Sequence, residues 1–194
     1  MTGPLMPSPD ARRSAWAVLA ALLLASPAAA LDVGGVTFPG TRTVGEATLK
    51  LNGAGVRTYS VFRVDVYAAG LYLEQPSTSA DAILRSPGRK LIEVRALRAV
   101  AADAIQSAWR TSFEANCQAP CRIPDDAARF VAAVQQSRTG DANTYVFGPA
   151  GVQVMLNGQT VGSYGAEFGQ LLLYTFIGPA PPTEALKRAL LGGG

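Results

Sequence analysis

The side chains in this sequence that could carry chemistry are few, and one type is missing. Histidine is absent from all 194 residues. Without an imidazole the chain cannot build a Ser-His-Asp or Cys-His nucleophile, a histidine-ligated metal site or an imidazole general base. This leaves a short list of chemistries, and we expect neither a metal nor an organic cofactor.

Cys117 and Cys121 are the only cysteines, and three residues separate them. Two thiols without further Cys or His cannot complete an ordinary zinc site. A thioredoxin-type redox motif has two intervening residues rather than three. Pro120 breaks a regular helix and lets the chain fold back, so that the two Cα atoms approach to about 5–6 Å. We therefore expect a disulfide in an oxidising compartment, with two free thiols as the alternative.

The first 30 residues have the pattern of a signal peptide. Arg12 and Arg13 precede the apolar run Ala15–Ala25, and small residues follow at positions 28–30. The run is shorter than the roughly twenty residues that a membrane-spanning helix needs. We predict export to the periplasm or the medium by the general secretory route, with twin-arginine export as the alternative.

Residues 31–194 are predicted to form a single domain without a membrane span. The basic residues of this region are scattered and form no cluster that alternates with aromatic residues. A nucleic-acid interface needs a concentrated basic stripe. We therefore expect no nucleic-acid partner.

Hydrophobic periodicity predicts an α+β fold, in which helices cover one face of an antiparallel sheet. In residues 60–74 the alternation places Phe62, Val64, Val66, Ala68, Gly70 and Tyr72 on one face and Arg63, Asp65 and Tyr67 on the other, as in a half-buried strand. Strands are predicted at 46–58, 60–74, 90–97, 144–147, 152–156 and 159–164, and helices at 79–84, 101–116, 125–136, 166–177 and 183–191.

Two local patterns have simple structural interpretations. The run Asn52–Gly55 resembles part of a phosphate loop, but strand sequence follows it, so a strand bulge is the better prediction. Glu93 and Arg95 lie on one face of the third strand and are expected to form a solvated pair of small energetic value.

Four short motifs, in this order along the chain, resemble the chalcone isomerase superfamily. They are Gly53–Arg57, Gly70–Glu74, the helix that ends at Asn116 and Cys117, and Phe176–Gly178. The resemblance runs from about Val33 to Leu191 and is greatest to the bacterial chalcone-isomerase-like proteins. It implies the family's open-faced β-sandwich, with a ligand cleft between the sheet and the helices.

The superfamily contains plant enzymes that close a flavonoid ring, fatty-acid-binding proteins and non-catalytic relatives. The enzymes' arginine and asparagine are kept here as Arg57 and Asn116. The tyrosine that helps to organise the reacting phenolate matches Trp109, whose indole has no ionisable hydroxyl. A second hydroxyl residue of the enzymes aligns with Gly169, and a threonine aligns with Tyr67. Most of the cyclase constellation is therefore missing.

The resemblance implies a carboxylate site instead. Fatty-acid-binding relatives are similar to this chain at Arg57 and Tyr67, where arginine and tyrosine together hold a carboxylate. Both groups can make charge-assisted hydrogen bonds to an anion. By the same resemblance Trp109, Phe113 and Asn116 are the remaining candidate ligand-binding residues, with the aromatic pair along an apolar tail.

The residue types also allow structural roles. Arg57 could pair with Asp65 or Glu46, the Tyr67 hydroxyl could lie in water, and the two aromatic residues of the helix could be core. Our leading hypothesis is an exported binding protein for a fatty acid or similar small apolar carboxylate. One alternative is an isomerase (intramolecular lyase) acting on a chalcone-like or other small substrate, in which Arg57 polarises an oxyanion and Tyr67 transfers a proton. Another is a non-catalytic structural or interaction domain.

Overall fold

The computed structural model describes Gly3 and residues 29–59, 64–117 and 121–193. The predicted signal peptide, residues 1–30, therefore lies almost wholly outside the described residues. Phe62 and Arg63, which the sequence places in the second strand, and Pro120, between the cysteines, also lie outside them.

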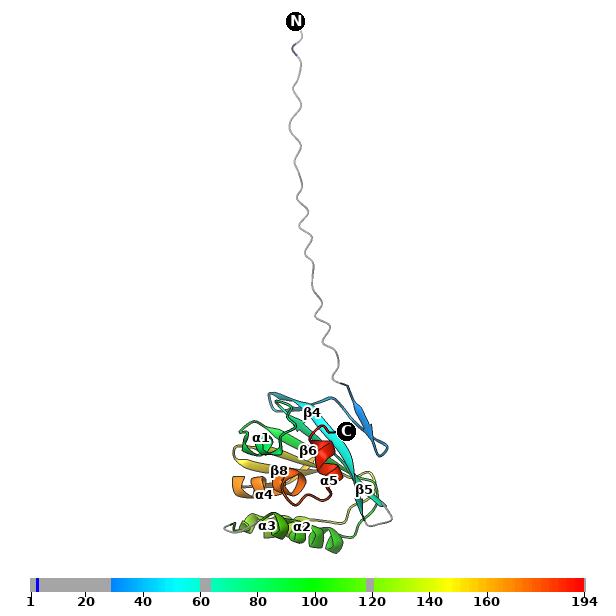
Figure 1. The fold of residues 1–194 in the computed structure, drawn as a ribbon, viewed down its shortest axis with the longest axis vertical. Helices are drawn as coiled ribbons and strands as arrows, with labels where there is room; N and C mark the ends of the chain where they lie inside the picture. Colours follow the sequence, from blue (N-terminus) through cyan, green and yellow to red (C-terminus); the bar gives the residue numbers. More distant parts are fainter. Residues whose placement is uncertain (1–2, 4–28, 60–63, 118–120, 194) are drawn as a thin grey trace.

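A seven-stranded antiparallel sheet forms the centre of the fold, and its strands follow one another in chain order. Figure 1 shows the helices on one side of this sheet, with α5 beside β4 and α4 beside β8. The strands are β3 (Thr41–Val44), β4 (Ala47–Tyr59), β5 (Val64–Leu73), β6 (Lys90–Ala96), β7 (Ala142–Gly148), β8 (Gly151–Leu156) and β9 (Gln159–Tyr164). The α+β class and the helix-covered sheet are confirmed.

A short hairpin precedes the sheet and was not predicted. Its strands are β1 (Leu31–Val33) and β2 (Val36–Phe38), and they pair only with each other. Strands of three or four residues, as in β1, β2 and β3, are too short for alternation to separate them from loops.

The helices are α1 (Ala80–Arg85), α2 (Ala102–Asn116), α3 (Asp125–Ala133), α4 (Ala166–Ile177) and α5 (Glu184–Leu190). Ser79 and Thr183 cap α1 and α5 by accepting hydrogen bonds from the backbone N–H groups of the first turn. The predicted end of α3 at residue 136 is wrong. The chain leaves the helix at Val134 because Ser137 pairs with Val100 in a β-bridge.

Strand β5 is buried on both faces, so the prediction of a half-buried strand is wrong. Ala69 and Leu71 face the helices, whereas Ala68 and Tyr72 belong to a second apolar cluster on the opposite face. The hairpin β1–β2 supplies the buried Phe38 to that second cluster. Its ring packs on β5 so closely that a Cβ on Gly70 would lie 2.6 Å from Phe38 Cδ1.

The run Asn52–Gly55 is a bulged strand, as predicted, because the register of β4 against β5 shifts between Leu51 and Gly53. The glycines serve packing. A Cβ on Gly53 would lie 2.0 Å from the carbonyl oxygen of Ala189, and one on Gly55 would lie 2.6 Å from Ala189 Cβ. Helix α5 can therefore lie directly on β4.

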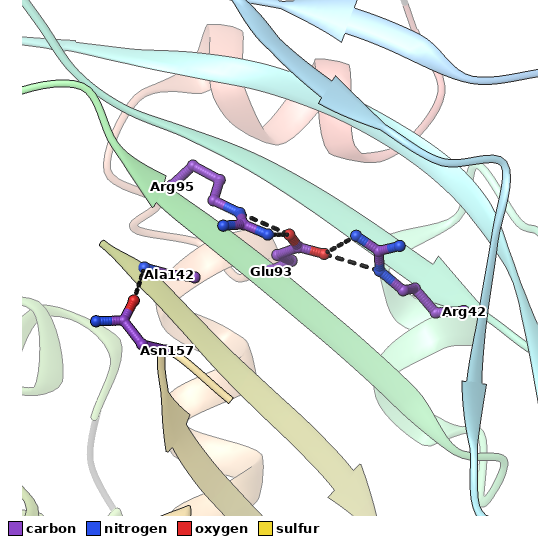
Figure 2. A network of polar contacts seen from close by, with 5 residues as sticks. All are labelled: Arg42, Glu93, Arg95, Ala142 and Asn157. Carbon is purple, nitrogen blue, oxygen red and sulfur yellow. Dashed lines mark hydrogen bonds and ion pairs between the residues drawn. The ribbon is translucent and has the colours of Figure 1, made fainter. Parts of the chain in front are cut away.

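Glu93 is not part of a solvated pair, which corrects the expectation for this residue. Figure 2 shows the Glu93 carboxylate between Arg42 of β3 and Arg95, which lies on β6 with Glu93 itself. The distance from Nη2 of each arginine to a carboxylate oxygen is 2.7 Å. The Glu93 side chain is only 5% exposed, while those of Arg42 and Arg95 are 30% and 37% exposed. Arg42, 51 positions away, completes the shielding of the carboxylate.

Candidate functional site

Arg57 and Tyr67 stand directly opposite each other on β4 and β5. Both lie on the face that the helices cover, since Gly55 contacts α5 and Tyr67 packs against the helix-side core. The guanidinium carbon of Arg57 lies 5.7 Å from the ring centre of Tyr67 and 5.7 Å from that of Tyr59. These distances are typical of cation–π contacts, so two aromatic rings hold the guanidinium group.

No carboxylate of the described chain neutralises Arg57. The ion pairs found among these residues include neither Asp65 nor Glu46 as its partner. Cation–π contacts leave the N–H groups at the rim of the guanidinium group available for hydrogen bonds in its plane. The guanidinium group of Arg57 can therefore bind an anion that does not belong to the chain by donating hydrogen bonds to it.

Tyr67 is a neutral hydrogen-bond donor in this environment. Burial raises the pKa of its hydroxyl to about 12, although the Arg57 charge lowers it in part. At neutral pH the phenol keeps its proton and can donate it in a hydrogen bond to a carboxylate. The pair thus combines a permanent cation with a neutral donor, which suits the recognition of an anion.

Tyr145 on β7 belongs to the same region and was missed by the sequence analysis. Burial raises its pKa above the usual range, and the neighbouring Tyr67 raises it further. Its ring centre lies 6.2 Å from that of Trp109, so it connects Tyr67 with the helix α2. Alternation with Phe147 indicates that Tyr145 is buried, but the sequence does not show that it lies near Tyr67.

Trp109 and Phe113 lie together on α2, as predicted, with ring centres 5.5 Å apart. They join a cluster of rings that also contains Phe130, Tyr145, Tyr164, Phe168 and Phe176, with neighbouring centres 5.1–6.5 Å apart. Phe113 is buried, whereas Trp109 is only partly buried. The path assigned to a ligand tail is therefore filled by side chains, of which Trp109 is the accessible one.

Asn116 holds the connection between α4 and α5. Its Nδ2 donates to the carbonyl oxygens of Ser112 and Ala180, at 2.9 and 2.8 Å, and its Oδ1 accepts from the Ala180 N–H at 3.2 Å. Cys117 follows and forms a disulfide with Cys121, with 5.2 Å between their Cα atoms. The end of α2 is thus fixed by the hydrogen bonds of the Asn116 side chain and by the disulfide.

Two hollows, of about 180 and 210 Å³, lie at the other end of the strands, and neither is lined by Arg57 or Tyr67. Among the described residues no group of three or more His, Cys, Asp or Glu side chains could hold a metal ion. None of the described helices is both long and apolar enough to cross a membrane.

An antiparallel sheet covered by helices, with a motif arginine facing them, defines a chalcone-isomerase-like domain. Residues 30–192 match the chalcone isomerase-like family, so the chain belongs to that family. The solved structure of a fatty-acid binding protein from Arabidopsis thaliana is similar to this chain, with a TM-score of 0.67 and 17% sequence identity. The match covers 81% of this chain and 92% of that one. No curated protein sequence matches the chain.

Proposed function

We propose that this protein binds a small apolar carboxylate, such as a fatty acid, with the head group at Arg57 and Tyr67. The observation that carries the proposal is the guanidinium group of Arg57, which two tyrosine rings hold and no described carboxylate neutralises. The family membership and the similar fold of the Arabidopsis fatty-acid binding protein support it.

The head group binds by a charge-assisted hydrogen bond from Arg57 and a second hydrogen bond from the neutral Tyr67 hydroxyl. Each hydrogen bond to a charged group contributes about 1.5–3 kcal/mol. Tyr59 is 63% exposed, and its ring centre lies 5.7 Å from the guanidinium carbon. In this proposal the carboxylate approaches Arg57 from the side of the exposed Tyr59.

The tail binds along the aromatic cluster on α2, where Trp109 and Phe113 lie. Because these rings are in mutual contact, a tail enters only when the partly buried Trp109 moves aside. Asn116 positions this wall by clamping α2 to the backbone of Ala180. Longer tails bury more apolar area, so affinity should rise with chain length until the displaced volume is filled.

Calorimetric titration with octanoate, decanoate and dodecanoate tests the proposal. Arg57→Ala should weaken binding about tenfold or more, and Tyr67→Phe should weaken it less, because the phenol is neutral and its ring remains. Arg110→Ala, which removes an exposed arginine of α2, is the matched control and should bind like the wild type. The proposal fails if the wild type binds none of the three acids, or if folded Arg57→Ala binds them equally well.

An isomerase activity is the alternative that the same titration leaves open. A tyrosine whose pKa is about 12 is a poor proton acceptor at neutral pH, where catalytic groups work best with pKa values near the operating pH. Trp109 also lacks a hydroxyl. Turnover of a chalcone by the wild type, lost in Tyr67→Phe, would favour the isomerase over the binding protein.

We also propose that the protein is exported and that residues 1–30 are removed as a signal peptide. Support comes from the arginine pair before a short apolar run and from the disulfide Cys117–Cys121, since disulfides persist mainly in oxidising compartments. Amino-terminal sequencing of protein from the exported fraction tests this. A mature chain that begins near Leu31 is expected, and a chain that keeps residues 1–30 contradicts it.

A further inference from the structure

A buried lysine lies at the end of the sheet away from Arg57. Ala96 of β6 stands opposite Tyr67, and Lys90 lies six residues before it on the same strand. At about 3.3 Å per residue the two positions are roughly 20 Å apart. Lys90 is only 7% exposed, and lysine is rarely buried to this extent without a partner for its charge.

The ammonium group of Lys90 is incompletely satisfied by the described chain. Its Nζ donates to the carbonyl oxygens of Ser86 at 2.7 Å and Gly88 at 2.9 Å, just beyond α1. A lysine ammonium has three donors, and the described residues give no partner for the third. The ion pairs found among these residues do not include Lys90, and the Glu74 carboxylate accepts the backbone N–H of Arg89.

The two hollows share part of their lining. Lys90 and the two residues whose carbonyl oxygens it binds, Ser86 and Gly88, line both of them. The hollow of about 210 Å³ is also lined by Glu74 and Arg89, whose charges are opposite. Among the described residues, Lys90 is the only charged one that lines the hollow of about 180 Å³.

The walls of this smaller hollow combine polar backbone with apolar side chains. The apolar surface comes from Phe147, Leu173, Pro87 and Pro149, and the exposed Gln170 also lines the hollow. Burial lowers the pKa of Lys90, and the Glu74 charge opposes this shift. An anion beside the ammonium group would favour its charged form further.

We propose that the hollow of about 180 Å³ is a second ligand site, which binds the carboxylate group of a small organic acid on Lys90 and its short apolar part against Phe147 and Leu173. The volume holds several atoms beyond a single water, which needs about 10–15 Å³ of such space. The site is distinct from the one proposed at Arg57, and neither depends on the other.

Titration with sodium butanoate, followed by two-dimensional ¹H–¹⁵N NMR, tests the site. Butanoate should shift the amide signals of Gly88, Gly151 and Gly169, which line the hollow, and butan-1-ol should not. Lys90→Met should weaken butanoate binding by about tenfold or more, as expected for loss of a hydrogen bond to a charged partner. Lys187→Met is the matched control, because Lys187 also donates to one carbonyl, of Gly178, but lines neither hollow.

Gln170→Glu is a second variant, which still tests the site if Lys90→Met does not fold. Gln170 is exposed and lines the hollow, and the nearly isosteric change adds a negative charge and removes the hydrogen bond from Nε2 to the Leu84 carbonyl oxygen at 3.3 Å. Butanoate should bind this variant several-fold more weakly. The proposal is overturned if folded Lys90→Met or Gln170→Glu binds butanoate as tightly as the wild type does. It is also overturned if butan-1-ol shifts the same amide signals as much as butanoate does. Arg57→Ala should leave butanoate binding at Gly88 and Gly169 unchanged, which separates this result from the test of the Arg57 site.

Discussion

Arg57 of β4 and Tyr67 of β5 are directly opposed residues, and the guanidinium carbon of one lies 5.7 Å from the ring centre of the other. The Arg57 charge lowers the pKa of Tyr67, against the stronger effect of burial, which raises it to about 12. This coupling is open to direct measurement without any ligand.

Arg57→Ala should therefore raise the pKa of Tyr67 further, because the favourable interaction of the phenolate with the guanidinium group is lost. The titration can be followed by the ultraviolet absorbance of tyrosinate, with Tyr67→Phe identifying the signal by its absence. Arg110→Ala should leave the titration unchanged. A Tyr67 pKa that stays the same or falls in Arg57→Ala would show that the two side chains are not coupled.

Trp109 should report occupation of the aromatic cluster by a ligand tail. The chain has two tryptophans, and Trp16 lies in the predicted signal peptide, so Trp109 is the sole tryptophan of residues 31–194. Binding of dodecanoate should change its fluorescence, because the ring must leave its contacts with Phe113 and Phe130. Butanoate, which we assign to the hollow at Lys90, should not change it. The same fluorescence with saturating dodecanoate as without it would place the tail elsewhere.

Glu93→Gln should destabilise the fold by about 2–3 kcal/mol. The change leaves Arg42 and Arg95 without a carboxylate between β3 and β6, and breaking a buried pair costs about 3–5 kcal/mol. We expect a smaller cost than for a fully buried pair because both arginines are partly exposed and can regain contact with water. Urea unfolding measures the effect. Asp81→Asn, which breaks a largely exposed pair with Arg85, should change stability by less than about 1 kcal/mol.

The bounds of several helices and strands can be predicted from the sequence more reliably than the contacts between distant segments. Helix α4 and strand β9 match the predicted bounds at residues 166–177 and 159–164, because periodicity and turn signals act over neighbouring residues. Asn157 and Gly158 have φ angles of 49° and 82°, as the predicted tight hairpin requires. Local pattern is thus sufficient for these elements.

Contacts between distant segments were not predictable in the same way. Arg42 reaches Glu93 only because β3 continues the sheet at the edge, and β3 was not recognised. Tyr145 lies near Tyr67 only because β5, β6 and β7 are neighbours in the sheet. The family resemblance implies only that Arg57 and Tyr67 lie near one another, and their direct opposition is a finding of the structure, since no local pattern gives the register of two long strands.

Asp126 should make the stability of the fold depend on acid pH. Its carboxylate accepts a hydrogen bond from the Gly165 N–H at 2.7 Å, which joins the start of α3 to the start of α4, and it pairs with Arg129. The bond from Gly165, followed by the Arg129 contact, lowers the pKa of Asp126 below its usual value.

The unfolded chain therefore binds a proton at this carboxyl group more readily than the folded one. The stabilisation is complete above the unfolded pKa of about 4 and is lost as the pH falls through the lower folded value. Asp126→Asn should be less stable than the wild type at pH 7, with a smaller loss of stability on acidification. Asp125→Asn, at the neighbouring exposed position, is the control. Equal slopes of stability against pH below 4 for Asp126→Asn and wild type would contradict the assignment.

Gly70→Ala should destabilise the packing of the hairpin β1–β2 on the sheet. The added methyl group would lie 2.6 Å from Cδ1 of the fully buried Phe38, so the ring must move. Overpacking of this kind costs about 1–3 kcal/mol, and alanine's preference over glycine in a strand offsets about 0.5–1 kcal/mol of it.

Phe38→Leu, which removes the contacting ring atoms, should make room for the methyl group. The double variant should then lose less stability than the two single variants together, by more than about 0.5 kcal/mol. Gly148→Ala is the control, because its Cβ would meet no atom within 4 Å. Strict additivity of the two changes in urea unfolding would show that Phe38 does not set the requirement for glycine at position 70.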